Sequence, residues 1–203
     1  MKLSELSVDG LRNLSKVSLT SIADVNLLYG SNGAGKTSVL EAIHMLGLAR
    51  SFRGAQQQPV IQFNQPSCTV SGVVAVEQQR TRLGVERTRN RGIRIRVNGQ
   101  DEKSALTLAQ HLPIQMINAS SYLLLEGGPK PRRGFLDWGV FHVEHGFYDA
   151  WQKVQRSIKQ RNSLLRAHAK TNGSLTQLSS SLKPWNRELQ VVAPYLDQLR
   201  QAY

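Results

Sequence analysis

The N-terminal part of the chain contains short apolar segments whose pattern predicts strands followed by a helix. Residues 3–8 and 14–19 alternate between apolar and polar side chains, as half-buried strands do. Residues 25–29 are apolar at almost every position, which favours a more central strand. Apolar residues then occupy nearly every face of a helical pattern over residues 35–48, so this helix should be largely buried.

The middle of the chain has the pattern of an antiparallel meander. Strands are predicted over residues 69–76, 81–86 and 93–97, and the last of them alternates strictly between apolar residues and arginine. The turn sequence Asn98-Gly99 follows directly. Two further predictions for this region are a short helix over residues 104–112 and a strand over residues 114–117.

From about residue 130 onward the pattern is helical. Helices are predicted over residues 132–141 and 147–170, and a last helix is predicted to begin at Pro184. The serine-rich residues 171–181 lie between these helices and predict a connector.

The change from strand-rich to helix-rich sequence near residues 129–131 indicates a boundary between two parts. We therefore predict a first domain over residues 1–128 and a helical lobe over residues 129–203. The last helical pattern stops at Tyr203 without a capping signal, so we expect the lobe to be truncated there.

Residues 30–37 match the phosphate-binding pattern G-x-x-x-x-G-K-[ST], between a predicted strand and a predicted helix. The glycines let the backbone curl so that its amide hydrogens face a phosphate, and the helix N-terminus adds the positive end of its dipole. Lys36 is expected to bridge the β and γ phosphates of ATP, and Thr37 to give its hydroxyl to Mg²⁺. The predicted ATP-binding residues are Gly30, Ser31, Asn32, Gly33, Ala34, Gly35, Lys36, Thr37 and Ser38.

Hydrolysis of the bound nucleotide also needs an acidic residue at the end of a core strand. Glu126 follows three leucines, but Gly127, Gly128 and Pro129 come directly after it and no second acid accompanies it. The sequence therefore leaves two interpretations open. Either the chain is a fragment of a longer ATPase, or it binds nucleotide without hydrolysing it.

The chain is strongly basic, with a formal net charge of +12 and a pI near 10.3, which suits a partner with a phosphate backbone or a generally basic solvated surface. Arginines crowd residues 80–96 with only Glu86 among them, and residues 151–187 contain no acid. These stretches favour DNA, because a solvated surface normally mixes signs. The candidate DNA contacts are Arg53, Arg80, Arg82, Arg94, Arg96, Lys153, Arg156 and Lys159.

Several remaining features restrict the class of protein. The single cysteine, Cys68, excludes an internal disulfide and fits a reducing compartment. The N-terminus lacks the apolar core of a signal peptide, and no window approaches the roughly 18 apolar residues of a membrane span. We expect a cytoplasmic protein without a membrane partner. The five histidines show no spacing that would assemble a metal site.

A set of short motifs extends beyond the P-loop. It consists of Leu11-Arg12-Asn13-Leu14, residues 37–43, Ser51-Phe52-Arg53, residues 128–139 and Gln160-Arg161-Asn162. Together they resemble the RecF family of ABC-type ATPase heads, relatives of the SMC and Rad-type repair ATPases. The block that ends in Phe135-Leu136-Asp137 makes the resemblance specific, since it is not a generic nucleotide-binding motif.

The resemblance implies an α/β fold, namely a P-loop NTPase head of ABC/SMC type in which a mixed sheet carries an antiparallel meander. It further implies an inserted helical lobe and a C-terminal half of the fold beyond this chain. Arg12 is a candidate nucleotide contact, as the matching residue is in related heads, and the alternative is a surface arginine after a turn. Gln115 is a candidate Q-loop contact to Mg²⁺ at the nucleotide, and the alternative is a structural glutamine in a strand. ATP and Mg²⁺ are the implied cofactors.

As partners, the resemblance implies a homodimer that forms around ATP in the full-length protein, single-stranded or gapped duplex DNA, and the RecO and RecR proteins. The implied role is recombinational repair and replication, including the SOS response, with help in loading recombinase at gaps. The alternatives are a transporter ATPase subunit, a P-loop phosphotransferase, or a nucleotide-binding module without turnover. A transporter subunit gives no reason for the two basic stretches, and a small-molecule kinase needs a lid and an acceptor pocket that the sequence does not show.

Overall fold

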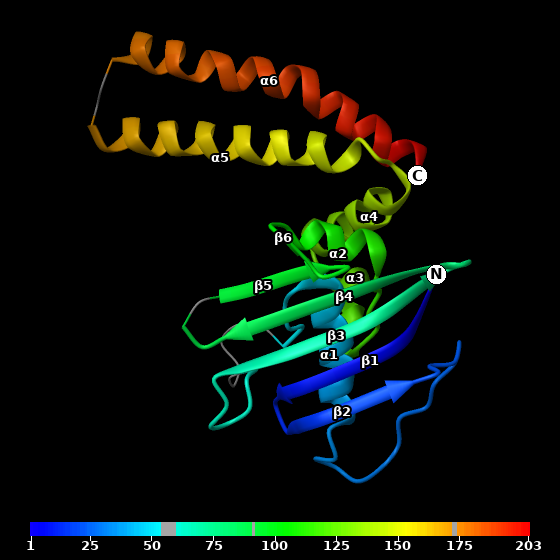
Figure 1. Cartoon of the computed structure of the whole chain (residues 1–203). Coiled ribbons are helices and arrows are strands. Elements are labelled where there is room, and N and C mark those ends of the chain that lie inside the picture. The colour runs from blue at the N-terminus through cyan, green and yellow to red at the C-terminus, as the bar shows by residue number, and fades with distance from the viewer. Residues whose placement is uncertain (54–59, 91, 172–173) are drawn as a thin grey trace. The chain divides into compact units, whose positions relative to one another are not determined.

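The computed structural model describes residues 1–53, 60–90, 92–171 and 174–203. The chain forms two compact units, Met1–Met116 and Ile117–Tyr203 (Figure 1). The division falls earlier than the predicted boundary between residues 128 and 129. The short helices η1 (Ala119–Tyr122) and α3 (Leu123–Glu126) precede that boundary and join the helical unit.

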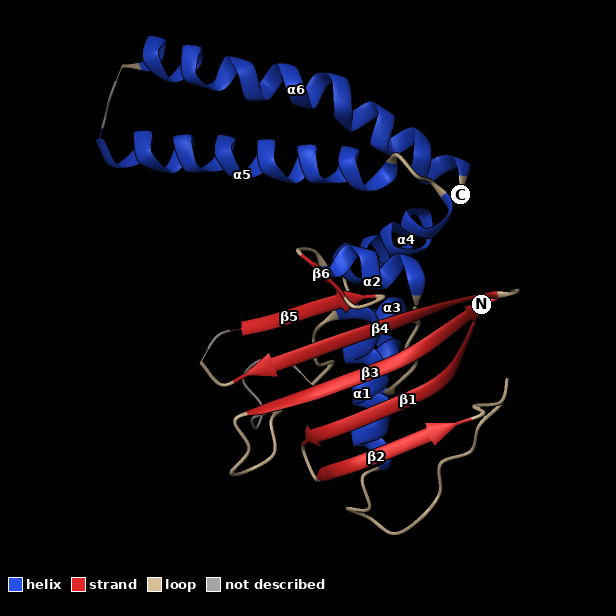
Figure 2. Ribbon diagram, in the orientation of Figure 1, coloured by secondary structure: helices blue, strands red, loops and turns tan. Residues whose placement is uncertain are grey.

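The first unit contains a six-stranded sheet in the order β2-β1-β3-β4-β5-β6, in which every neighbouring pair is antiparallel (Figure 2). The strands are β1 (Lys2–Leu11), β2 (Leu14–Thr20), β3 (Ser67–Val76), β4 (Gln79–Thr88), β5 (Gly92–Val97) and β6 (Gln100–Glu102). Alternation decides which side chains enter the core: Leu6 and Val8 of β1 are buried, whereas Ser7 and Asp9 are exposed. The predicted meander is confirmed, and only the short strand β6 had no prediction.

Helix α1 (Lys36–Leu48) lies across one face of this sheet, as the prediction of a largely buried helix requires. Its side chains Met45 and Leu46 are fully buried against the strands. A Cβ on Gly72 of β3 would come within 2.7 Å of the Leu46 side chain, so the absence of a side chain there lets helix and sheet approach closely. The helix α2 (Ala105–His111) packs beside α1 and is capped by Ser104, whose Oγ accepts from the amide of Leu106.

Two predicted strands do not form. Residues 25–29 and 114–117 pair with no strand in the part of the chain that the structure describes. Val25, Leu27 and Tyr29 are 89%, 83% and 87% exposed, so the apolar run is not covered. The prediction of a central strand over residues 25–29 was therefore wrong for the described chain. A strand forms only where another strand pairs with it, and composition alone does not supply that partner. The described sheet is consequently antiparallel throughout.

The second unit is helical and is built around a long hairpin. Its main helices are α4 (Pro129–Val143), α5 (Phe147–Thr171) and α6 (Leu175–Ala202). Helices α5 and α6 run side by side (Figure 1), and Val154 of α5 and Leu196 of α6 lie in their shared apolar core. The guanidinium of Arg200 donates to the carboxylate of Asp137, with 2.8 Å between Nε and Oδ1, and ties α6 to α4.

The start of α6 corrects the sequence-based assignment. The serine-rich residues 175–181 belong to the helix, which begins at Leu175 and continues through Pro184 and Pro194. Of the remaining connector, residues 172–173 lie outside the described residues. A proline inside a helix removes one backbone hydrogen bond, but Leu189, Val192 and Leu199 pack against the shared core and compensate for that loss.

No helix in the described ranges combines the length and the apolar character that a membrane span requires.

Candidate functional site

The P-loop adopts the curled conformation that its glycines predict. Gly30, Gly33 and Gly35 have φ values of 140°, 84° and 96°, which L-residues with a side chain rarely adopt. Gly35 is also confined by packing, because a Cβ at this position would come within 2.6 Å of the Leu14 side chain. The loop leads directly into the first turn of α1, where Thr37 is exposed. A phosphate placed over this loop would meet the N-terminus of a buried helix.

Lys36 lies over the loop and is held there by it. Its Nζ donates to the carbonyl oxygens of Gly30 and Ser31 at 2.8 and 2.9 Å. These bonds direct the ammonium group across the loop, so a single positive charge is fixed over the P-loop.

The turn between β1 and β2 forms hydrogen bonds with the P-loop and with the start of α1. The sequence analysis did not predict these contacts. The side-chain amide of Asn13 donates to the carbonyl oxygen of Gly33 at 2.6 Å. Its Oδ1 accepts from the hydroxyl of Ser38 at 2.7 Å. One asparagine therefore joins the apex of the loop to the start of α1. The only sequence signal was that Asn13 stands in the short motif after β1, 20 residues before Gly33.

A second feature that sequence reasoning missed is Glu41, a fully buried carboxylate on α1. Its oxygens accept from Nε and Nη2 of Arg12 at 3.0 and 2.7 Å, and from the hydroxyl of Ser51 at 2.5 Å. Nε of Arg53 lies 3.6 Å from Glu41 Oε2. The sequence signal was an acid within a helical pattern that is apolar on nearly every face.

The pKa of Glu41 reflects two opposing effects. Burial by itself raises the pKa, but the hydrogen bonds from Arg12 and Ser51, with the charges of Arg12 and Arg53, outweigh it and leave the pKa below its usual value. Glu41 is therefore an anion at neutral pH, and it orients two arginines beside the P-loop.

These elements enclose a pocket of about 680 Å³, within the size range of small-molecule sites. It is lined by Arg12, Asn13, Asn32, Gly33, Ala34, Gly35, Lys36, Thr37, Ser38, Arg53, Ile61 and Phe63. Most of the predicted ATP-binding residues therefore meet in one place, together with Arg12 and Arg53. Gln115 is exposed and does not line this pocket. Glu126 lies in the helix α3 and not at the end of a strand, so it does not have the setting of a catalytic acid.

The arginines of the sheet are largely paired with acids. Nε and Nη2 of Arg94 both lie 2.8 Å from the carboxylate of Asp101, and Nε of Arg96 lies 3.1 Å from the same group. Hydrogen bonds from these two arginines lower the pKa of Asp101 to about 2. Arg80 of β4 pairs with Glu5 of β1, across the intervening strand β3. Asp101 lies on β6, a strand that the sequence analysis did not predict. Its negative charge reduces the net charge of Arg94, Arg96 and Asp101 together from +2 to +1.

Arg82 shares the open face of the sheet with these arginines. Together with Arg94 and Arg96 it lines a smaller hollow of about 320 Å³. The acid Glu86 borders the same hollow, so this surface carries both signs of charge.

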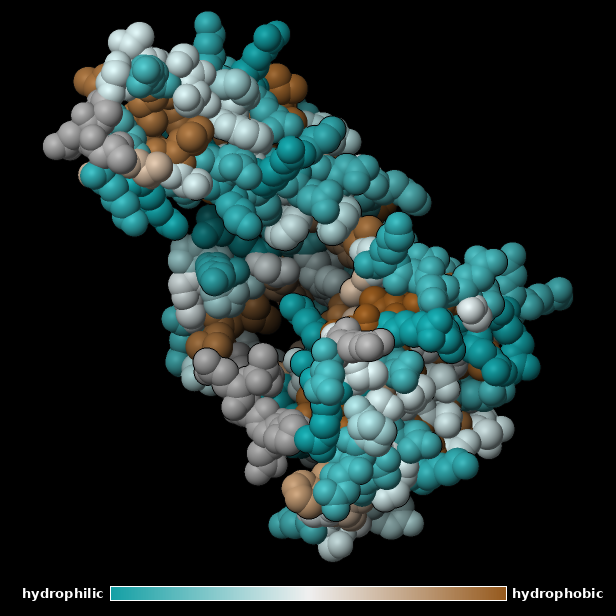
Figure 3. Space-filling model, turned by 60° about the vertical axis from the view of Figure 1, so that its left-hand side comes forward, coloured by the Kyte–Doolittle hydropathy of each residue, from teal (hydrophilic) through white to brown (hydrophobic). Residues whose placement is uncertain are grey.

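The cations of α5 are arranged differently. Ala150, Val154 and Ser157 form the buried face of the helix, whereas Lys153, Arg156 and Lys159 are exposed. These three residues form no ion pair with a carboxylate in the described part of the chain. Figure 3 shows one face of the molecule, on which hydrophilic residues cover most of the surface. Helix α5 thus presents an uncompensated row of positive charge.

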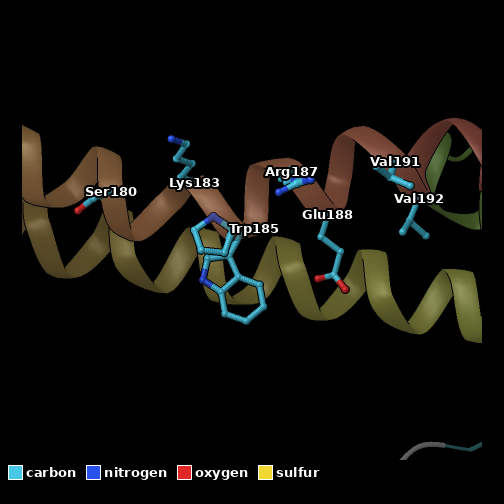
Figure 4. Close-up of a pocket in the computed structure, with 8 residues that line it drawn as sticks. Ser180, Lys183, Trp185, Arg187, Glu188, Val191 and Val192 are labelled. Carbon is cyan, nitrogen blue, oxygen red and sulfur yellow. The ribbon is translucent and has the colours of Figure 1, made fainter.

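Helix α6 adds two further cations next to a hollow of about 730 Å³ (Figure 4). Lys183 and Arg187 line this hollow with Pro184, and in Figure 4 Trp185 and Glu188 extend toward α5. The guanidinium carbon of Arg156 lies 6.0 Å from the centre of the Trp185 ring, which holds this arginine of α5 against α6.

Comparison with known proteins places the chain in a family. The model of the RecF/RecN/SMC N terminal domain matches residues 2–179. The DNA replication and repair protein RecF of Stutzerimonas stutzeri (strain A1501) is 52% identical over 204 residues, which is 100% of this chain and 53% of that protein. The protein of the same name from Pseudomonas syringae pv. tomato is also 52% identical, over 54% of its length. The chain thus spans about half the length of these relatives.

Solved structures agree with this result. A structure of the recombination mediator protein RecF with ATP in the RecFOR pathway has a TM-score of 0.84 and 28% identity, over 99% of this chain and 53% of that one. An SMC ATPase structure with a TM-score of 0.52 and 16% identity shares the fold, over 67% of this chain and 98% of that one. The fold is that of a RecF/SMC ATPase head, and the chain belongs to the RecF/RecN/SMC N-terminal domain family.

Proposed function

We propose that this chain is the nucleotide-binding part of a RecF-type protein of DNA replication and recombinational repair, and that it binds ATP with Mg²⁺ in the P-loop pocket. The observation that carries the proposal is the P-loop itself, with three glycines at positive φ and Lys36 held across the loop. The similarity to a RecF protein whose structure contains ATP supports it.

In this proposal different residues of the pocket bind different parts of the MgATP complex. The amides of residues 30–38 and Lys36 bind the phosphates, and the exposed hydroxyl of Thr37 binds Mg²⁺. Arg12 and Arg53, oriented by Glu41, add positive charge at the same pocket. The described residues that line the pocket include no acid, and we propose that this chain binds ATP without turning it over by itself.

Replacing Thr37 with valine tests the magnesium role, because valine has nearly the same shape and lacks the hydroxyl. We expect ATP affinity measured with Mg²⁺ to fall by about 10-fold or more, and affinity measured with EDTA to stay unchanged. Isothermal titration calorimetry of the 203-residue chain measures both values. An equal loss with and without Mg²⁺ would assign Thr37 a role other than metal binding.

We propose that DNA binds along α5, through Lys153, Arg156 and Lys159. In the described residues no carboxylate pairs with these three cations, so their charge is available to DNA phosphates. Arg80, Arg94 and Arg96 of the sheet, in contrast, have acidic partners. Phosphate contacts carry no base-specific information, so we expect binding with little sequence preference. ATP-dependent dimerisation, cooperation with RecO and RecR, and assistance to recombinase at gaps are the finer parts of the proposal for the full-length protein.

Two matched double variants separate the two basic surfaces. Arg156→Gln with Lys159→Gln should flatten the plot of log affinity against log salt by up to about 1.8 units, because each lost phosphate contact removes roughly 0.9. Arg94→Gln with Arg96→Gln removes the same number of charges and should change the slope little, since both arginines pair with Asp101. Fluorescence anisotropy with duplex and gapped DNA measures these slopes. If the Arg94→Gln, Arg96→Gln variant changed the slope more than the α5 variant did, the DNA interface would lie on the sheet and not on α5.

A further inference from the structure

The P-loop pocket contains an aromatic side chain that the binding of phosphates leaves unused. Phe63 is 84% exposed, although it is a large apolar residue, and it lines the same pocket as the P-loop. Its neighbour Ile61 lines the pocket too and is buried in the core. One end of the pocket is therefore made of phosphate-binding amides and cations, and another part is apolar.

The turn that carries Phe63 is held in place on several sides. The amide of Gln65 donates to the carbonyl of Gln62 at 3.1 Å, which closes a turn around Phe63 and Asn64. Asn64 has a φ of 64°, a conformation that asparagine tolerates better than most residues. The Arg89 side chain donates to the carbonyl oxygens of both Gln62 and Gln65, at 3.0 and 2.8 Å.

The same turn is also joined to the strand that precedes the P-loop region. The amide of Gln62 donates to the carbonyl of Gly10 at 2.8 Å, and Ile61 forms a bridge with Leu11. The amide of Arg12 donates to the carbonyl of Val60 at 2.8 Å. The segment that presents Phe63 is thus fixed to the turn whose Asn13 holds the P-loop. An exposed ring on a rigid support loses little conformational entropy when a flat ligand covers it.

We propose that Phe63 is the nucleobase platform of this pocket, and that its ring stacks on the purine of the bound nucleotide. The inference rests on the proposed binding of ATP and names the residue that recognises the base. A nucleoside triphosphate carries its anionic chain and its aromatic base at opposite ends, and the pocket offers P-loop amides for the first and Phe63 for the second. Stacking on an aromatic side chain tolerates different bases, so ATP and GTP should bind with similar affinity.

The test compares MgATP with magnesium tripolyphosphate, which lacks the ribose and the base. Phe63→Ala should weaken MgATP binding by roughly 10-fold and leave tripolyphosphate binding unchanged, as measured by calorimetry on the 203-residue chain. Phe63→Tyr keeps the ring and should restore the affinity for ATP. Because Phe63 is exposed, neither change should shift the unfolding temperature.

A further variant, Phe63→Trp, reports the contact between the base and the side chain at position 63 by fluorescence. In Phe63→Trp, with the protein's own tryptophans unchanged, ATP should alter the added fluorescence and tripolyphosphate should not. Equal losses for both ligands in Phe63→Ala, or no loss for ATP, would overturn the platform while leaving the P-loop role intact. If the unchanged chain bound neither ligand, the proposed nucleotide site itself would fail, and the base platform with it.

Discussion

Replacing Lys36 with alanine is expected to weaken ATP binding by about 10- to 100-fold and to leave the fold unchanged. The Lys36 ammonium lies over the P-loop through its bonds to the carbonyls of Gly30 and Ser31, so it is already placed for a phosphate when the nucleotide arrives. A hydrogen bond between charged groups contributes about 1.5–3 kcal/mol, and every 1.4 kcal/mol corresponds to a factor of about ten in affinity. These bonds lie at the surface, so losing them should not destabilise the core.

The matched control is Lys16→Ala, which removes the same charge from an exposed position on β2. Calorimetry with MgATP should give nearly the same affinity for this variant and for the unchanged chain. Circular dichroism checks that all three proteins are folded. A folded Lys36→Ala chain with unchanged affinity would contradict the assignment of the P-loop, because the other cations among the described residues of the pocket, Arg12 and Arg53, lie outside the loop.

The features that the sequence predicted are those that short segments determine alone. The curl of the P-loop follows from glycines at positions that need positive φ, and the strands of the meander follow from alternation of period two. Helix α5 was predicted to within a residue because its apolar positions repeat at helical spacing over a long segment. In each case the evidence lies within about twenty-five neighbouring residues.

Features that depend on contacts between distant segments could not be predicted in this way. Glu41 meets Arg12 across 29 positions of the chain, and no local pattern specifies that contact. Residues 25–29 have the composition of a central strand, but pairing decides whether a strand forms. The arginines of β5 predicted a phosphate-binding surface. In the structure β6 pairs with β5, and Asp101 of β6 forms ion pairs with both Arg94 and Arg96.

Replacing Glu41 with alanine is expected to destabilise the first unit by about 3–5 kcal/mol, which is the usual cost of removing one partner of a buried ion pair. The Arg12 side chain is only 8% exposed, so it cannot recover its hydration without moving out of the pocket wall. Glu41→Gln keeps the shape of the side chain and can still accept hydrogen bonds, so its cost should be smaller.

The measurement must report on the first unit. The three tryptophans, Trp138, Trp151 and Trp185, all lie in the second unit, so their fluorescence does not follow the surroundings of Glu41. Hydrogen exchange of the amides in β1, β3 and α1 does follow them. Unchanged protection of these amides in Glu41→Ala would show that the buried cluster contributes little to stability.

The dependence on pH gives an independent check on the same cluster. The pKa of Glu41 lies below its ordinary value of 4.5 in the folded chain, so its ionised form stabilises the fold fully above that value. The contribution is lost as the pH falls from 4.5 through the lowered pKa. The stability difference between the unchanged chain and Glu41→Gln should therefore be constant near neutral pH and should shrink in acid. A difference that stayed constant below pH 4.5 would mean that packing, and not the charge on Glu41, holds Arg12 and Arg53 beside the P-loop.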